Sequence, residues 1–282
     1  MSPAIAIVVA LFAVLAVVEL GAYARKTGRP YPRRDAVRAL ACYLGFFLTT
    51  ELLRGLAAPL YALVGRHGIA VAPESTWAAW LLAFLGEELL YYWQHRLMHA
   101  ARFAWAHHRV HHEIRSMTFV TGMQNGWFGV VAGKWLYCLP LALLGFEPQM
   151  LLDLMTANML YNYILHTELA PPLRWLEWGL NTPSLHRVHH SYLPEHIDHN
   201  FGAIVSLYDR LFGTFRREQP GEVEGYGLAP RAREIGVFAL NLEEWRAIAR
   251  DLARARRPRS ALLAVLGPRP EARATLEASR NA

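Results

Sequence analysis

The chain has 282 residues, of which 54% are hydrophobic and only 18% are charged, and its formal net charge is +6. This composition is unusual for a soluble protein and indicates a membrane protein. The basic residues form no stripe with interleaved aromatics, so we expect no binding to nucleic acid. The two cysteines occur without a C-x-x-C motif, which excludes cysteine-ligated zinc and iron–sulfur centres.

Five apolar runs predict the secondary structure. Each approaches or exceeds the roughly 20 residues that a helix needs to cross a bilayer, and they cover residues 4–23, 41–64, 76–94, 126–145 and 149–167. We therefore expect an all-α fold, an integral membrane bundle of about four to five membrane helices with a cytosolic helical cap. The last two runs form either a full hairpin or a shallower pair.

The charges around the first run predict its orientation. No basic residue precedes it and ARKTGRPYPRR follows it, which is the reverse of a signal peptide. We interpret it as a retained transmembrane helix with its N-terminus outside. Counting the crossings then places every repeated histidine motif on the cytoplasmic side. Abundant alanine and arginine suggest a GC-rich genome and hence a bacterial inner membrane.

Twelve of the thirteen histidines lie between residues 95 and 199, in short motifs. HRLMH begins at His95, and HRVHH occurs at 108–112 and again at 186–190. On a helix, His95 and His99 at i and i+4 share one face, with their rings close enough to bind one ion. In each HRVHH motif the three histidines at i, i+3 and i+4 form a triangle on one face. The three motifs contribute eight imidazoles, enough for two first-row metal ions with coordination positions left open. Packing alone explains this set poorly, because buried imidazoles need partners.

The sequence lacks the motifs of several other enzyme classes. It contains neither the HExxH of zinc peptidases nor the GxSxG of serine hydrolases, and no glycine-rich nucleotide loop. Peptidase, serine hydrolase and kinase chemistry are therefore not predicted.

The histidine motifs and their surroundings resemble those of the fatty acid hydroxylase / sterol desaturase superfamily. The stretches that carry the resemblance are EELLYYWQHRLMH, WAHHRVHH, YNYILHTEL and LNTPSLHRVHHSYLPEHIDHNFGAIVSLYDRLFGTF. The last is similar to the branch that contains alkylglycerol monooxygenase. The segment SMTFVTGMQN differs from that branch, so neither its substrate nor its pterin cofactor is carried over.

The resemblance covers about residues 40–216, and together with the hydropathy and charge pattern it predicts three segments. Residues 1–40 are an N-terminal membrane helix and basic linker, 41–216 a catalytic domain, and 217–282 a basic cytosolic tail. The tail is predicted to be partly helical, with a helix over 241–256 that begins at Asn241.

The resemblance also implies the roles of individual residues. The expected metal ligands are His95, His99, His108, His111, His112, His166, His186, His189 and His190. Asn162 is expected to act as a weaker ligand or through water. Glu88 is expected to contact the ligand residues without binding the metal itself. Asp198 and Asn200 are expected to orient ligand rings through hydrogen bonds. No catalytic residue beyond the metal site is predicted, and residues for another cofactor are unknown.

The function that the resemblance implies is a membrane-bound non-haem diiron oxygenase. It would hydroxylate a C–H bond of a lipid from the bilayer, using O₂, two iron ions and electrons from a separate protein or reductant. A lipid or sterol desaturase of the same superfamily is the near alternative. A membrane metal-binding or transport protein and a catalytically inactive scaffold are alternatives of other classes.

Overall fold

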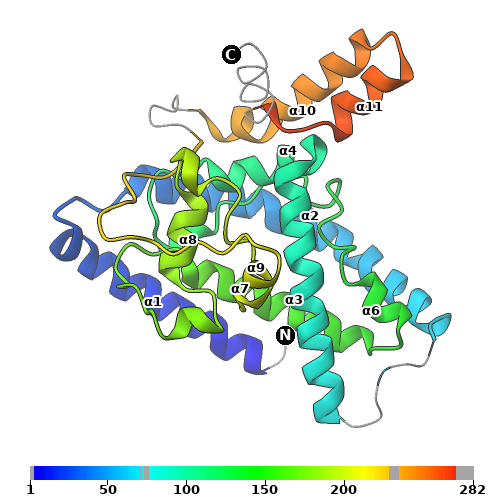
Figure 1. The fold of residues 1–282 in the computed structure, drawn as a ribbon, viewed down its shortest axis with the longest axis horizontal. Helices are drawn as coiled ribbons and strands as arrows, with labels where there is room; N and C mark the ends of the chain where they lie inside the picture. Colours follow the sequence, from blue (N-terminus) through cyan, green and yellow to red (C-terminus); the bar gives the residue numbers. More distant parts are fainter. Residues whose placement is uncertain (1–2, 70–71, 73–75, 229–234, 271–282) are drawn as a thin grey trace.

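The computed structural model describes residues 3–69, 72, 76–228 and 235–270. Its described residues form helices and no strand, apart from two isolated β-bridges, so the predicted all-α fold is confirmed for them (Figure 1). The longer helices are α1 (Pro3–Thr27), α2 (Arg33–Arg66), α3 (Thr76–Ala100), α4 (Arg102–His112), α7 (Pro148–Leu165) and α10 (Val237–Arg254). The shorter ones are α5 (Phe119–Gly122), α6 (Leu139–Leu143), η1 (Leu176–Trp178), α8 (Pro183–His190), η2 (Pro194–His196), α9 (Leu207–Leu211) and α11 (Pro258–Leu266).

The long helices coincide with four of the five predicted apolar runs. The boundary predicted between residues 40 and 41 lies inside α2, which already begins at Arg33. Within the described part of the chain, no helix combines the length and the apolarity that crossing a membrane requires.

The fourth apolar run does not form the long helix that its composition suggested. Residues 127–138 make successive turns, and only Leu139–Leu143 are helical. Gly126 and Gly129 pack so closely on His107 that a Cβ atom would lie 2.6 Å from its carbonyl oxygen or 2.7 Å from its ring. Gly133 has a φ of +74°, which glycine adopts without strain. The run therefore passes His107 as turns, with glycine at the two closest approaches.

Two changes of chain direction position the histidine motifs. Ala101 alone separates α3 from α4, and its extended backbone lets α4 fold back against α3, where Met98 packs with Ala104. The helix α8 begins after Thr182, whose hydroxyl accepts from the backbone N–H of Leu185. Because α8 packs against α7, the second HRVHH motif meets the end of α7.

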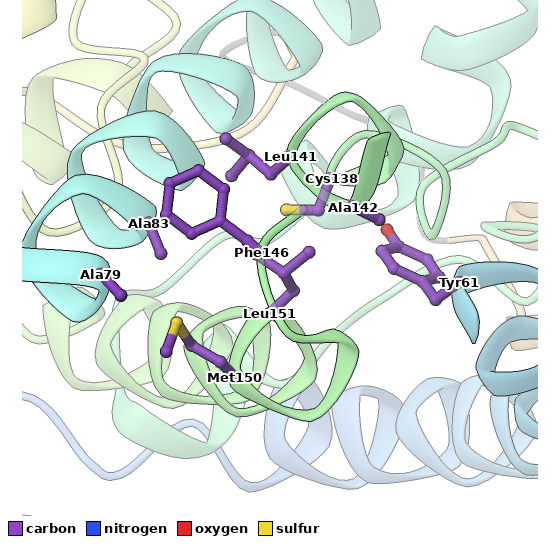
Figure 2. Close-up of a cluster of buried hydrophobic side chains, with 9 residues drawn as sticks. All are labelled: Tyr61, Ala79, Ala83, Cys138, Leu141, Ala142, Phe146, Met150 and Leu151. Carbon is purple, nitrogen blue, oxygen red and sulfur yellow. The ribbon is translucent and has the colours of Figure 1, made fainter. Parts of the chain in front are cut away.

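The largest apolar core lies away from the histidine motifs, where α2, α3, α6 and α7 meet. Figure 2 shows side chains from all four helices and from two residues that flank α6 converging there: Tyr61, Ala79, Ala83, Cys138, Leu141, Ala142, Phe146, Met150 and Leu151. This core fixes the relative positions of α3 and α7, which both carry predicted site residues.

The C-terminal helices lie on the side of α4. Helices α10 and α11 pack on α4, above it in Figure 1. The start of α10 at Val237 corrects the predicted start at Asn241, whose side chain instead accepts from the backbone N–H of Trp127 at 2.9 Å. Residues 271–282 of the predicted tail lie outside the described residues.

Candidate metal centre

The nine predicted ligand histidines converge in two clusters. In each cluster, one ring nitrogen per residue lies within 4.8 Å of all the others. Eight of the nine side chains are buried and His111 is half-buried. The first cluster contains His95, His99, His108, His112 and His189, and the second contains His111, His166, His186 and His190.

The two copies of HRVHH divide their histidines between the clusters in opposite ways. The first copy contributes two rings to the first cluster and one, His111, to the second; the second copy contributes two to the second cluster and one, His189, to the first. Positions i and i+4 differ by only about 40° around a helix, whereas i+3 and i+4 differ by about 100°. In each motif the first and last histidines, at i and i+4, therefore point to the same cluster. The middle histidine, at i+3, points to the neighbouring cluster.

In the second cluster the Nε2 atoms crowd around one point. Nε2 of His166 lies 3.3 Å from that of His111, 3.1 Å from that of His186 and 3.2 Å from that of His190. One nitrogen carries either one proton or one lone pair, so it cannot bond to three partners at once. Four nitrogens bound to an ion at about 2.0–2.1 Å in a tetrahedron lie roughly 3.3–3.4 Å apart, close to these separations.

The first cluster also presents unsatisfied nitrogens. Nε2 of His108 lies 2.9 Å from that of His95 and 3.1 Å from that of His112. Nε2 of His99 and of His189 are buried without a hydrogen-bond partner. Buried polar atoms are normally paired, so both clusters fit binding of metal ions, with iron among the compatible ions.

Backbone carbonyls orient four of the rings. Nδ1 of His95 donates to the carbonyl oxygen of Phe201 at 2.8 Å, and Nδ1 of His189 donates to that of His199 at 2.8 Å. In the second cluster, Nδ1 of His111 and of His166 donate to carbonyls at 3.0 and 2.7 Å. A proton held on Nδ1 leaves the Nε2 lone pair facing the cluster, as a metal ligand requires.

Burial keeps the rings neutral. Desolvation is the largest cause that lowers the pKa of His189 to about 4. Desolvation, reinforced by neighbouring imidazoles, also lowers the pKa well below its ordinary value for His95, His99, His108, His111, His112, His186 and His190. Neutral imidazole is the form that binds metal.

Of the two loop residues predicted to orient rings, one contacts a ring directly. Oδ1 of Asp198 lies 3.3 Å from Nδ1 of His99. Asn200 instead donates to the backbone carbonyls of Leu185 and Arg216, so it holds α8 against the following loop. Asp198 and Asn200 have φ values of 62° and 56°, which Asp and Asn tolerate better than most residues.

Glu88 and Asn162 lie farther from the rings. Glu88 accepts from the backbone N–H groups of Ile204 and Val205 and from Asn158. Asn162 donates to Asn158 through its side chain, and only its backbone carbonyl meets His166. These contacts tie α3, α7 and the loop before α9 together behind the second cluster.

The remaining histidines take no part in either cluster. His107 packs against the glycines at 126 and 129, and His196 lies 3.2 Å from Glu222. His199 contributes its carbonyl oxygen to His189, and His67 is an exposed loop residue.

Sequence reasoning missed two buried contacts from outside the motifs. Glu19 on α1 accepts from Thr167, the neighbour of His166, at 2.5 Å. Arg269, just after α11, lies 3.0 Å from Nδ1 of His99. The charge of Glu19 within an apolar run was the one available signal; nothing in the local sequence marks Arg269.

Comparison with known proteins agrees with this site. The family described as Fatty acid hydroxylase matches residues 80–214, which include all nine clustered histidines. Alkylglycerol monooxygenase of Danio rerio is 35% identical over 218 residues, covering 76% of this chain and 47% of the relative. Its counterpart in Homo sapiens is 36% identical over 152 residues, covering 54% and 34%.

A bacterial relative extends the comparison. Ornithine lipid hydroxylase OlsE of Rhizobium tropici is 27% identical over 124 residues, covering 44% of this chain and 38% of the relative. No solved structure matches the chain. The chain spans about half the length, or less, of these curated relatives. Through its residues 80–214, the chain belongs to the fatty acid hydroxylase / sterol desaturase superfamily.

Proposed function

We propose that the chain is a membrane-bound non-haem diiron oxygenase that hydroxylates a C–H bond of a lipid with O₂ and external electrons. The observation that carries the proposal is the pair of adjoining histidine clusters, nine imidazoles in all. A neutral, nitrogen-only set of this size suits two iron ions better than a single structural zinc ion, which needs four ligands.

The proposal gives the histidines, the backbone carbonyls and the burial of the site separate roles. When bound, two iron ions would supply the reductive activation of O₂ that attack on an unactivated C–H bond requires. The first cluster would hold one ion and the second cluster the other. The carbonyls that accept from Nδ1 orient the rings, and burial excludes water from the site.

The relatives favour lipid hydroxylation over desaturation. Their names describe a monooxygenase that acts on alkylglycerols and a hydroxylase that acts on ornithine lipids. The desaturase alternative differs in its product and is separated by the experiment below.

Exposed apolar faces support attachment to a membrane. Large apolar side chains are exposed along one face of α2 at intervals of three and four residues, at Val37, Leu40, Leu44, Phe47 and Leu48. Further ones lie on α1 and at the start of α3, including Val14, Val18, Trp77, Trp80 and Leu81. Apolar surface of this extent marks contact with lipid or protein, and we propose a bilayer, with the histidine motifs on its cytoplasmic side.

The proposed organisation has a catalytic domain at 41–216, flanked by residues 1–40 and 217–282. Arg269 of the C-terminal segment lies beside His99, and Glu19 of the N-terminal segment accepts from Thr167, the neighbour of His166. Electrons would come from a separate donor. Exposed arginines between residues 250 and 259 suit an acidic one.

Lipid analysis tests the proposal. Extracts of cells that express the wild-type chain are compared by mass spectrometry with extracts of cells that express His189→Ala. We expect a lipid that gains one oxygen atom only with the wild type; loss of two hydrogen atoms would identify a desaturase instead. His67→Ala, which changes an exposed histidine outside both clusters, is the matched control. Identical lipids with wild type and His189→Ala would contradict the proposal.

A further inference from the structure

The buried guanidinium of Arg269 enters the first cluster from outside the matched family segment. It lies 2.9 Å from Oδ2 of Asp198 and 3.0 Å from Nδ1 of His99. Its Cζ atom also lies 5.1 Å from the ring centre of Trp105, which itself packs on His99. The C-terminal segment therefore contacts a predicted ligand with a charged side chain.

Ion pairs of the buried Arg102 hold this segment on α4. Arg102 donates to Glu244 and to Asp251 at 2.6 Å each, and to the carbonyl oxygen of Ala264 at 3.3 Å. Its backbone N–H donates to the carbonyl oxygen of Gly267, two residues before Arg269. These contacts hold the backbone just before Arg269, so the position of Arg269 does not depend on its side-chain contacts alone.

Nδ1 of His99 has two competing partners. It can donate to Asp198 or accept from Arg269, but not both, because it carries either a proton or a lone pair. Only donation to Asp198 leaves the lone pair on Nε2, the buried atom without a protein partner. The carboxylate must therefore stay beside His99 for this ring to bind a metal.

Asp198 by itself is poorly restrained. Its side chain is 51% exposed, whereas that of Arg269 is 7% exposed. A half-exposed carboxylate can turn toward water, and a buried arginine that pairs with it opposes this movement. His95 and His189 need no such device, because backbone carbonyls hold their Nδ1 atoms.

We propose that Arg269 is a positioning residue of the first cluster, which acts through Asp198 to hold His99 in the metal-binding tautomer. This inference rests on the proposed metal centre and extends it to a residue from the C-terminal segment. It also makes the two clusters unequal, because among the described residues the pair Asp198 and Arg269 contacts a ring of the first cluster and no ring of the second.

Cobalt binding to the full chain tests the role of Arg269. Metal-stripped protein in detergent is titrated anaerobically with Co²⁺ against a competing chelator, and the visible absorption reports the ligands. We expect the wild type to bind about two ions. In Arg269→Gln one of them should bind about 10- to 100-fold more weakly, with an altered spectrum, while the other is unchanged.

A double-mutant cycle separates positioning from general structural support. Since Arg269 acts through Asp198, the variant Arg269→Gln/Asp198→Asn should bind no more weakly than Asp198→Asn alone. Asparagine tolerates the positive φ of residue 198, so this variant remains informative if Arg269→Gln does not fold. Arg246→Gln, which changes an exposed arginine of the same segment, is the control.

Each outcome decides the question. Two ions bound as tightly in Arg269→Gln and Asp198→Asn as in the wild type would overturn this inference alone. Additive losses in the double variant would also overturn it, because they would show that Arg269 acts independently of Asp198. A wild-type chain that binds fewer than two ions would overturn the proposed function, and this inference with it.

Discussion

His112 and His190, the last residues of the two HRVHH motifs, stack with ring centroids 4.5 Å apart and 22° between their planes. They belong to different clusters, so this contact joins the two halves of the metal centre. The two short helices have the same histidine spacing and bring their rings together, and each contributes its middle histidine to the cluster that holds the first and last histidines of the other.

The division into clusters predicts how paired substitutions combine. His99→Ala/His112→Ala removes two rings from one cluster and should leave about one ion bound. His112→Ala/His190→Ala removes one ring from each cluster and should weaken both ions. Metal analysis after passage over a chelating resin measures the difference, with His67→Ala as the control. Equal retention in the two double variants would show that the division is wrong.

Acid should destabilise the metal-free protein. Below about pH 6.5 the unfolded chain takes up protons at imidazoles that remain neutral when folded, so the free energy of unfolding falls as pH falls. The pKa of His189, lowered to about 4, and the lowered pKa values of its neighbours set this direction. One such group contributes about 1.4 kcal/mol per pH unit.

Denaturant unfolding of chelator-treated protein, at several pH values from about 5 to about 8, measures this effect. Because several imidazoles act together, the slope below about pH 6 should exceed that of one group. A free energy of unfolding that stays constant over this range would contradict a neutral cluster.

Gly129 and Gly126 should respond differently to the same substitution. A Cβ atom on Gly129 meets only the ring of His107, at 2.7 Å, whereas one on Gly126 also meets its carbonyl oxygen, at 2.6 Å. Each change to alanine should cost about 1–3 kcal/mol of stability through overpacking. Adding His107→Ala should relieve Gly129→Ala but not Gly126→Ala, as thermal unfolding would show. Relief of both would mean that the backbone contact is unimportant.

Glu19 should link α1 to the second cluster. Glu19→Ala leaves the backbone N–H of Phe119 and the hydroxyl of Thr167 without their acceptor, at a cost of roughly 1–3 kcal/mol. Since Thr167 follows His166, the ion of the second cluster should also bind more weakly. Glu19→Gln keeps an acceptor and should lose less in both measurements. If Glu19→Ala bound the ion of the second cluster as tightly as the wild type, the role of α1 would be limited to stability.

Much of the centre could be predicted from local patterns. The spacing of His108, His111 and His112 places their rings on one helix face whatever the rest of the chain does. The resemblance added His166, which lies at the end of α7 beside His186. The apolar run at 126–145 was less informative, because composition records hydrophobicity but not the close approach of its glycines to His107.

The sequence alone therefore determined the kind of ligand and the faces on which the rings lie, because helical periodicity is a local property of the backbone. Only the tertiary structure decided which rings meet. The assignment of His111 and His189 to opposite clusters depends on how α4 and α8 pack, and the approach of Arg269 to His99 depends on where α10 and α11 dock. Contacts between residues about 170 positions apart in the chain arise from packing, which leaves no local signal in the sequence.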